Sequence, residues 1–417
     1  MTTYVSASAT GAAPKQRRVV GLDGIRGIAA LFVVLHHTYL VSYDTYPVNS
    51  GPSWLGWLMY GHLAVVVFIA LSGFSLAIGP ARRDWQLGGK ARFAFRRAWR
   101  ILPPYWAALV FSLIMAWTVA PEPGSAVPNG KSVVVYGLLL QDIVGSPIPN
   151  GAFWSIAVEA QLYIVFPLLL VMLRRASAIA MVAAVTILVT TVGVLAPHVA
   201  AVHLLIRLTP QFAALFALGL ASAGILRAPE RVQRWPWQWF SVAAVLPVLV
   251  VLVVKGTVWF QDNQYWVDLA LGPAIACFLA AVATGRARSV RWLLDTWPVR
   301  RLGTFSYSLY LIHAPIVVAI GTKVVGPHVH GGLPRFFLTL ALALPISLVA
   351  AHLFATVFEI PFTKYRSWDA LRAAVRARLR PSAAEPAPAT EPAAPAPVTE
   401  AAVPAVRASA PVPVSER

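Results

Sequence analysis

The stretch WLMYGHLAVVVFIALSGFSLAIG, residues 57–79, decides the fold class of this chain. It contains no Asp, Glu, Lys or Arg, and as an α-helix it would extend about 34 Å at 1.5 Å per residue. The hydrocarbon core of a bilayer is about 30 Å thick, so a helix of this length and composition can cross it. We therefore predict a transmembrane helix at this position.

The same criterion predicts nine further spans along the 417 residues. They lie near residues 25–43, 104–120, 153–173, 177–196, 203–226, 237–256, 266–285, 303–325 and 334–358. The apolar run 133–144 is too short to cross a bilayer and is predicted to be a re-entrant or interfacial segment. The predicted fold is all-α, a polytopic transmembrane helical bundle of about ten spans.

The composition of the chain agrees with this fold class. Hydrophobic residues make up 58% of it and charged residues 12%, and the mean hydropathy is +0.68, whereas soluble domains carry about 25% charged residues. These values exclude a soluble globular enzyme, a coiled coil and a wholly disordered protein. The single cysteine, Cys277, excludes an intrachain disulfide and a cysteine-based metal site, and we expect no bound metal.

The basic residues predict the orientation of the chain. The net charge of +18 would indicate a nucleic-acid partner in a soluble chain, but the charges here are clustered between apolar runs, and we expect no nucleic acid. With the N-terminus inside, 29 of the 34 basic residues are cytoplasmic, and those at the outer side are Lys131, Arg207, Lys255, Lys323 and Arg335. This bias is typical of a multi-pass protein of the cell membrane, here with both termini in the cytoplasm.

The first span, which begins LDGIRGIAALFVVLHH at residues 22–37, carries a phased pair of ionisable residues. Arg26 and His37 are eleven residues apart, so their side chains share a helix face and lie about 16 Å apart along the axis. His36 points about 80° away from that line. Ionisable residues inside a span are costly to bury, so His37 is a candidate functional residue. A hydrogen-bonded histidine of the bundle is the structural alternative, and we favour that alternative for His36.

The fourth span, NGAFWSIAVEAQLYIVFP at residues 150–167, carries a polar stripe of Ser155, Glu159 and Tyr163, spaced four residues apart. By residue count, Glu159 lies about 9 Å below the outer surface, a depth similar to that of His37. His313, in the ninth span, reaches about the same level. We therefore expect these three ionisable groups to converge slightly outside the midplane.

The other ionisable residues of the spans carry a weaker signal. Asp268, Arg207 and Glu359 lie near predicted helix ends, where capping or snorkelling is the favoured interpretation. The predicted cytoplasmic loop RRDWQLGGKARFAFRRAWRILPPYW, residues 82–106, interleaves arginines with aromatic residues. Ordinary positive-inside topology explains such arginines, and so does a phosphate-binding cluster, because arginine donates bidentate hydrogen bonds to phosphate.

Six blocks now stand in order along the sequence: LDGIRGIAA…H, LSGF, FRRAWRILPPYW, WSIAVEAQLYIVFP, LGTFSYSLYLIHAP and Glu-x-Pro at 359–361. In these blocks the chain resembles the acyltransferase family 3 membrane proteins over residues 20–365. The resemblance implies transfer of an acyl group, often acetyl, from cytoplasmic acyl-CoA to a hydroxyl of a sugar, an envelope glycan or a glycosylated natural product. Ala64 and Val66 stand where the family usually has Gly and Asp, so we expect no role for an acid on the second span.

The resemblance also implies roles for single residues. The Arg-x10-His motif of the family falls on Arg26 and His37, and its acidic residue after Trp-Ser falls on Glu159. We expect His37 to be the general base for the acceptor hydroxyl, although a covalent acyl-histidine stays open. We expect Asp23 to position Arg26, and Glu159 either to orient the imidazole or to bind the acceptor. The expected donor site consists of Arg26, Arg96, Arg97, Arg100, Tyr105 and Ser72, and the expected acceptor site of Trp154, Ser155, Tyr163, Tyr310 and His313.

A transporter or flippase of lipid-linked or acylated sugars is the alternative from another class. Ten apolar spans with a buried acid would suit it, but it has no need of the Arg26–His37 pair or of the arginine-rich segment before the third span. A scaffold that uses the Pro-rich C-terminal segment as a ligand is a weaker alternative, because that segment lacks a P-x-x-P motif with basic flanks.

Four segments follow from this division of the chain: a cytoplasmic N-terminal segment 1–19, the transmembrane acyltransferase domain 20–365, a basic juxtamembrane segment 366–380, and a disordered cytoplasmic tail 381–417. The last is rich in Ala, Pro, Glu and Val without a period, so it cannot bury enough apolar area to offset the entropy of ordering.

We expect truncation after Leu379 to leave acyl transfer and thermal stability in detergent unchanged, because the tail has nothing to pack with. Turnover and melting temperature of the truncated and full-length proteins check this. Lost activity, or a melting temperature several degrees lower, would show that the tail docks on the cytoplasmic side.

Overall fold

The computed structural model describes residues 19–43 and 45–379, and within them every regular element is a helix. The first half of the chain forms α1 (Leu22–Ser42), η1 (Ser53–Tyr60), α2 (His62–Ala81), α3 (Lys90–Thr118), α4 (Gly130–Gly137), η2 (Gly151–Phe153), α5 (Trp154–Arg175), α6 (Ala178–Leu195), α7 (Ala200–Ile206), α8 (Gln211–Ser222) and η3 (Ala223–Leu226). The second half forms α9 (Glu230–Gln233), α10 (Trp237–Thr284), α11 (Arg288–Leu294), α12 (Trp297–Thr304), α13 (Ser306–Ala319), η4 (Ile320–Val325), α14 (Gly332–Phe354), η5 (Ala355–Glu359), α15 (Ile360–Lys364) and α16 (Trp368–Leu379). The all-α prediction is confirmed.

Eight helices in the described part of the chain are long and apolar enough to cross a membrane, and the bent pair of α7 with α8 and η3 makes a ninth. One of the eight, α10, is 48 residues long and is interrupted at Gly256 and Asn263. The Ser241 hydroxyl donates to the Ala274 carbonyl at 2.9 Å across this break, so the two arms fold back on each other. These arms correspond to the predicted spans 237–256 and 266–285. The total of ten spans and the side of the termini stay predictions.

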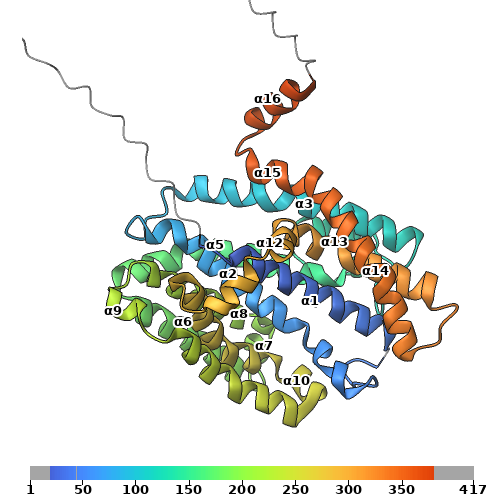
Figure 1. Cartoon of the computed structure of the whole chain (residues 1–417), viewed down its shortest axis with the longest axis horizontal. Helices are drawn as coiled ribbons and strands as arrows, with labels where there is room; N and C mark the ends of the chain where they lie inside the picture. The colour runs from blue at the N-terminus through green and yellow to red at the C-terminus, as the bar shows by residue number, and fades with distance from the viewer. Residues whose placement is uncertain (1–18, 44, 380–417) are drawn as a thin grey trace, which may run out of the picture. The chain divides into compact units, whose positions relative to one another are not determined.

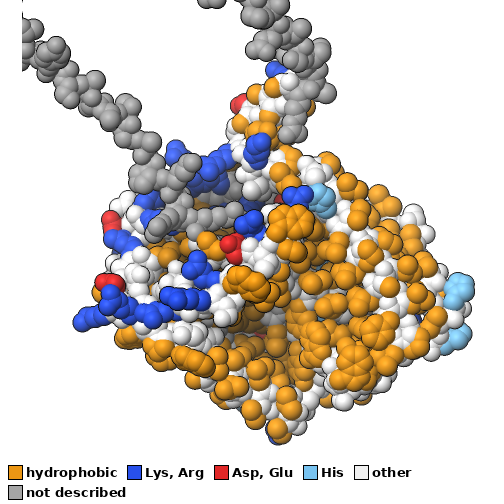
Figure 2. Space-filling model, viewed as in Figure 1, with side chains coloured by type: hydrophobic (Ala, Val, Ile, Leu, Met, Phe, Trp, Pro, Cys, Tyr) orange, Lys and Arg blue, Asp and Glu red, His pale blue; other side chains and the backbone are white. Residues whose placement is uncertain are grey.

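Helices from distant parts of the chain meet in the core. Helix α1 packs against α13 and α14, and α2 packs against α8 (Figure 1). The peripheral helices present large aliphatic side chains outward, such as Ile164, Ile179 and Val253, each more than 80% exposed. Figure 2 shows hydrophobic side chains over most of one face, with Lys and Arg gathered along one edge. Lipid contact explains this exposed apolar surface, which a water-soluble monomer could not tolerate.

Close approach of α2 and α8 depends on glycine. A Cβ atom on Gly73 would lie 2.2 Å from the Phe216 carbonyl oxygen, and one on Gly219 would lie 1.9 Å from the Ala70 carbonyl oxygen. Without side chains at these two positions the backbones can touch, as small residues allow between membrane helices. This contact sets the position of the α2 face that lines the functional site.

Two predicted elements differ from the structure. The arginine-rich segment is helical from Lys90, so Arg92, Arg96, Arg97 and Arg100 lie on α3, whereas Arg82 and Arg83 stay in the turn after α2. The single helix predicted near 203–226 is broken: α7 and α8 meet at 51°, with Thr209 at a positive φ of 46° followed by Pro210. Proline lacks the N–H that a continuous helix needs and disfavours helical geometry in the residue before it, so the break falls there.

Part of the predicted domain organisation lies outside the described residues, namely 1–18 of the N-terminal segment and the whole tail 381–417. Helix α16 occupies part of the basic segment predicted at 366–380.

We expect Gly219→Ala to lower the melting temperature by about 2–8 °C, because overpacking costs about 1–3 kcal/mol and the carbonyl that the new Cβ would meet belongs to a rigid helix. Thermal unfolding in detergent, followed by tryptophan fluorescence, measures this change. Gly137→Ala in α4 is the matched control, since a Cβ there meets nothing within 4 Å. Equal melting temperatures for the two variants would contradict the close α2–α8 contact.

Candidate active site

Three pockets follow one another through the bundle. The first, the arginine mouth, has a volume of about 550 Å³ and is lined by Arg82, Arg83, Arg96, Arg97, Arg100 and Arg366. The second, the central pocket, is smaller, about 120 Å³, and shares Ser75, Leu76, Arg97 and Arg100 with the mouth. The third, the histidine pocket, is about 350 Å³ and shares Val65 and Tyr310 with the central pocket. Because neighbouring pockets share lining residues, the three lie side by side in a row through the bundle.

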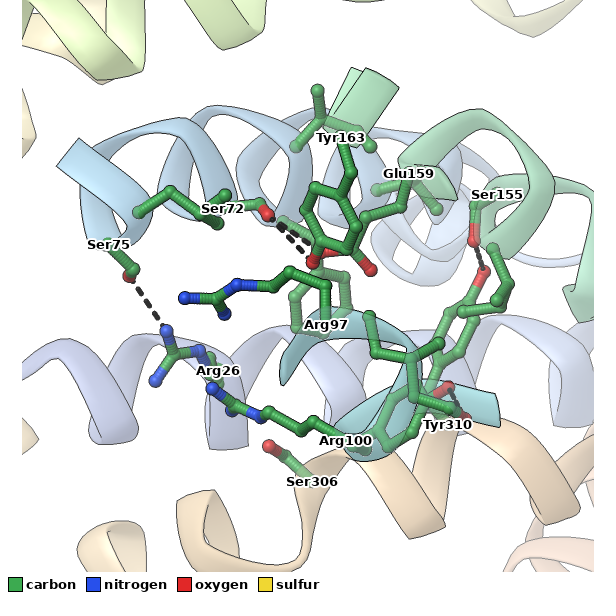
Figure 3. Close-up of a pocket in the computed structure, with 17 residues that line it drawn as sticks. Arg26, Ser72, Ser75, Arg97, Arg100, Ser155, Glu159, Tyr163, Ser306 and Tyr310 are labelled. Atoms are coloured by element: carbon green, nitrogen blue, oxygen red, sulfur yellow. Dashed lines mark hydrogen bonds between the residues drawn. The ribbon is translucent and has the colours of Figure 1, made fainter. Parts of the chain in front are cut away.

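The first turns of α1 hold Arg26 in the central pocket. Its guanidinium donates to Asp23 at 3.1 Å. It also donates to the Ser75 hydroxyl at 2.8 Å (Figure 3). Gly303 of α12 fixes this turn, because a Cβ at that position would lie 2.0 Å from the Asp23 carbonyl oxygen. Asp23 in the first turn is also favourably placed for the helix dipole. The contact is the one expected of a residue that positions Arg26.

Helix α3 brings further arginines to the same place. The Arg97 guanidinium carbon lies 5.7 Å from the Phe93 ring centroid and 5.9 Å from that of Tyr163, so aromatic rings support the cation. Its Nε is buried without a hydrogen-bond partner among the described residues. Within residues 19–43 and 45–379, no carboxylate forms an ion pair with Arg96, Arg97 or Arg100. These guanidinium groups are therefore available to an anionic ligand.

The predicted polar stripe of α5 lines the central pocket along its whole length. Glu159 accepts hydrogen bonds from the Ser72 hydroxyl at 2.6 Å and from the Tyr163 hydroxyl at 2.5 Å. Ser155 contacts the Tyr310 hydroxyl at 2.6 Å (Figure 3). The predicted site residues thus form two hydrogen-bonded groups, Ser72 with Glu159 and Tyr163, and Ser155 with Tyr310, and both line the central pocket together with the arginines.

His37 lies in the next pocket, among other histidines. Its ring centroid is 5.0 Å from that of His313 and 5.2 Å from that of His36. The described residues offer no hydrogen-bond partner to either ring nitrogen of His37, so both are available to a substrate. His36, in contrast, is hydrogen-bonded through Nδ1 to the Leu58 carbonyl at 2.7 Å, as its structural interpretation predicts.

His313 is fully buried behind His37. Its Nδ1 lies 2.8 Å from the Tyr310 carbonyl and donates to it, which leaves Nε2 as an acceptor without a partner in the described part of the chain. The predicted convergence of three groups therefore holds for His37 and His313 only. Glu159 lines the central pocket and not the histidine pocket. Residue counts treat helices as perpendicular to the membrane, whereas real spans tilt, so depth alone did not place Glu159.

The remaining predicted residues divide between the site and the core. Trp154 lines the histidine pocket, and Arg96 lines the arginine mouth. Tyr105 lines none of the three pockets: it is fully buried, its hydroxyl donates to the Tyr136 carbonyl at 2.8 Å, and its ring packs on Phe153. The structure thus places Tyr105 in the support of the fold and not in the expected donor site.

Several site residues were missed by the sequence analysis. Ser75 lies one turn after Ser72 on α2, a spacing that could have revealed it. Asp268 was interpreted as a helix-end residue, which is wrong: it is fully buried and accepts a hydrogen bond from His62 Nε2 at 3.0 Å. Glu359 is also not a simple cap, because it accepts from both the backbone N–H and the hydroxyl of Ser308. The folded-back arm of α10 brings Asp268 inward, and the π-helical turn η5 at the end of α14 brings Glu359 to Ser308.

Comparison with known proteins identifies the family. The family model described as an acyltransferase domain matches residues 19–352. The chain is 26% identical to the acyltransferase MdmB of Streptomyces mycarofaciens, over 91% of this chain and 98% of that protein. It is 22% identical to the peptidoglycan O-acetyltransferase OatA of Listeria monocytogenes, over 72% of this chain and 50% of that protein, so it spans about half of OatA. No solved structure matches the chain. The chain belongs to the acyltransferase 3 family and is a membrane-embedded acyltransferase.

Proposed function

We propose that the protein transfers an acyl group from cytoplasmic acyl-CoA to a hydroxyl of a sugar, an envelope glycan or a glycosylated natural product. Acetyl is the favoured acyl group. The observation that carries this proposal is the row of three pockets, which runs from a cluster of arginines to a cluster of histidines. The two ends suit different substrates, one anionic and one neutral. Family membership supports the acyl transfer itself.

The donor binds from the arginine mouth. Its phosphates would pair with Arg96, Arg97 and Arg100, whose guanidinium groups have no carboxylate partner among the described residues. The pantetheine arm would then pass Arg26 through the central pocket. Arg26 and His37 are about 16 Å apart along α1, on the order of the length of that arm. Glu159 faces this route, where a carboxylate can accept hydrogen bonds from the amides of the arm.

The chemistry takes place where the central and histidine pockets meet. The acceptor hydroxyl oxygen attacks the thioester carbonyl, and His37 takes the hydroxyl proton as general base. The C–S bond of the thioester breaks as the intermediate collapses, and the CoA thiolate recovers the proton from His37. Because Glu159 makes no hydrogen bond to His37 among the described residues, we assign Glu159 to the donor route and leave His37 beside His313.

The acceptor reaches the site from the opposite end, the histidine pocket. The positive-inside bias of the sequence puts the arginine mouth in the cytoplasm, so the acceptor comes from the outer face of the cell membrane. OatA is named a peptidoglycan O-acetyltransferase, which supports an envelope glycan as one acceptor class.

Release of thiol from acetyl-CoA by the purified protein in lipid nanodiscs tests the proposed function. Reaction mixtures contain chitotetraose, methyl glycosides or a glycosylated macrolide, and mass spectrometry identifies the acetylated product. Thiol release that requires an acceptor supports the proposal. A protein that moves these sugars across the bilayer of a liposome and never releases thiol would be a transporter.

We expect His37→Ala to lower kcat by about 10²–10⁴-fold, because a general base contributes on that order. Single-turnover assays with acetyl-CoA measure the loss. Thr38→Val is the control on the neighbouring residue, since the Thr38 hydroxyl is bonded within its own helix to the Val34 carbonyl and lines none of the three pockets. Turnover retained in a folded His37→Ala protein would refute the assignment of the base.

We expect Arg97→Ala and Arg100→Ala each to raise the KM for acetyl-CoA by about tenfold or more, because a charge-assisted phosphate contact contributes about 1.5–3 kcal/mol. Arg92→Ala, an exposed arginine earlier on α3 that lines none of the pockets, should leave KM unchanged. If all three variants express normally and share the wild-type KM, the arginines serve topology and not donor binding.

A further inference from the structure

A third histidine, beside His36 and His37, lines the histidine pocket and is held by a buried carboxylate. His62 Nε2 lies 3.0 Å from Asp268 Oδ1 and 3.1 Å from Oδ2, and the Gln211 amide donates to the same carboxylate at 3.3 Å. Three different helices supply these residues: α2, α10 and α8. The proposed mechanism gives none of them a role.

The carboxylate fixes which nitrogen of His62 faces the pocket. An ionised Asp268 accepts from Nε2 of His62, so in the neutral imidazole Nδ1 carries the lone pair. The His62 ring stacks on Trp154, with centroids 5.6 Å apart and planes 7° from parallel, so the ring cannot swing freely. The His62 side chain keeps 15% of its surface exposed, and it lines the pocket together with His37. A hydrogen-bond acceptor is therefore presented to any molecule in the pocket.

The neighbouring residues supply two more unused polar atoms. Gln211 is 5% exposed, and its Oε1 has no hydrogen-bond partner among the described residues. The Thr209 hydroxyl is likewise buried and unpaired within that part of the chain. Both residues line the histidine pocket, at the break between α7 and α8. Buried polar atoms are normally satisfied, and because these two residues line the histidine pocket, a ligand bound there could supply the missing hydrogen bonds.

We propose that His62, Gln211 and Thr209 form the acceptor subsite and bind hydroxyl groups of a neutral sugar ring beside His37. The site offers Nδ1 and Oε1 as acceptors, which suit hydroxyl donors. No Lys or Arg is among the described residues that line the pocket, so nothing there would neutralise a carboxylate or phosphate on the ring. The volume of about 350 Å³ and the aromatic walls, which include Trp154, suit one sugar ring.

The inference rests on the proposed function and names its acceptor class. In it His62 binds and orients the acceptor, whereas His37 takes the proton. Asp268 is a positioning residue that acts through His62. Asp268→Asn replaces a carboxylate that only accepts with an amide that can also donate to Nε2, so it removes the charge that holds the hydrogen of His62 on Nε2.

Saturation-transfer NMR with methyl β-D-glucopyranoside and the protein in nanodiscs tests the subsite without requiring turnover. We expect the wild-type protein to transfer saturation to the glucoside. The transferred signal should fall at least fivefold in His62→Phe, Asp268→Asn and Thr209→Val. Methyl β-D-glucuronide should receive no saturation from the wild-type protein. Tyr265→Phe is the matched control on α10, because the Tyr265 hydroxyl bonds to the Val189 carbonyl and lines none of the three pockets. Thr209→Val keeps the test valid if a change in the His62–Asp268 pair prevents folding, since it removes only an unpaired hydroxyl.

Equal saturation in the variants and the control, or no saturation of the glucoside above empty nanodiscs, would overturn the inference. Saturation without thiol release from acetyl-CoA would leave the subsite standing and refute the proposed transfer. During turnover, His62→Phe should raise the acceptor KM at least fivefold and change kcat less than twofold. A fall in kcat at constant KM would place His62 in proton transfer and overturn its role as a binding residue.

Discussion

A polar side chain inside an apolar helical bundle has no water to bond, so it needs a partner in the protein or in a ligand. The described part of this chain obeys this constraint at most buried positions: Glu159 is paired with Ser72 and Tyr163, and Glu359 with Ser308. Some of the exceptions lie at the three pockets. Arg97 Nε, His313 Nε2 and Gln211 Oε1 are buried without partners, and each lies in or directly beside the three pockets. Others, such as Gln238 Oε1, Arg291 Nε and Ser347 Oγ, line none of the three pockets.

Much of this arrangement could be predicted from local patterns. The all-α membrane fold follows from apolar runs long enough to cross a bilayer, and the shared face of Arg26 and His37 follows from helical phase. The stripe of Ser155, Glu159 and Tyr163 lines one pocket because spacings of four residues keep side chains on one face. Each of these inferences needs a single helix only, and the structure and the family comparison agree with the fold and the enzyme class.

What could not be predicted depends on how helices meet. Glu159 and His37 have similar computed depths, yet they line different pockets, because tilt and rotation decide which neighbours a side chain meets. Asp268 looked like a helix-end residue because nothing in its own span supplies a partner. Its partner His62 lies about two hundred residues earlier in the chain, and the packing of α2 on the folded-back arm of α10 brings the two together. The break at Thr209 was missed for a similar reason, since hydropathy does not register a bend.

The narrowness of the central pocket has a consequence for the membrane as a barrier. At about 120 Å³ it is far smaller than either end pocket, with room for a slender chain and not for a nucleotide or a sugar ring. Under the proposed function, the donor and the acceptor would each stay on its own side while the acyl group alone changes sides. Such a protein needs no alternating gates, because the constriction that aligns the two substrates also keeps the bilayer sealed. The acyl group would then cross the membrane simply because the new ester bond forms on the acceptor side of the constriction.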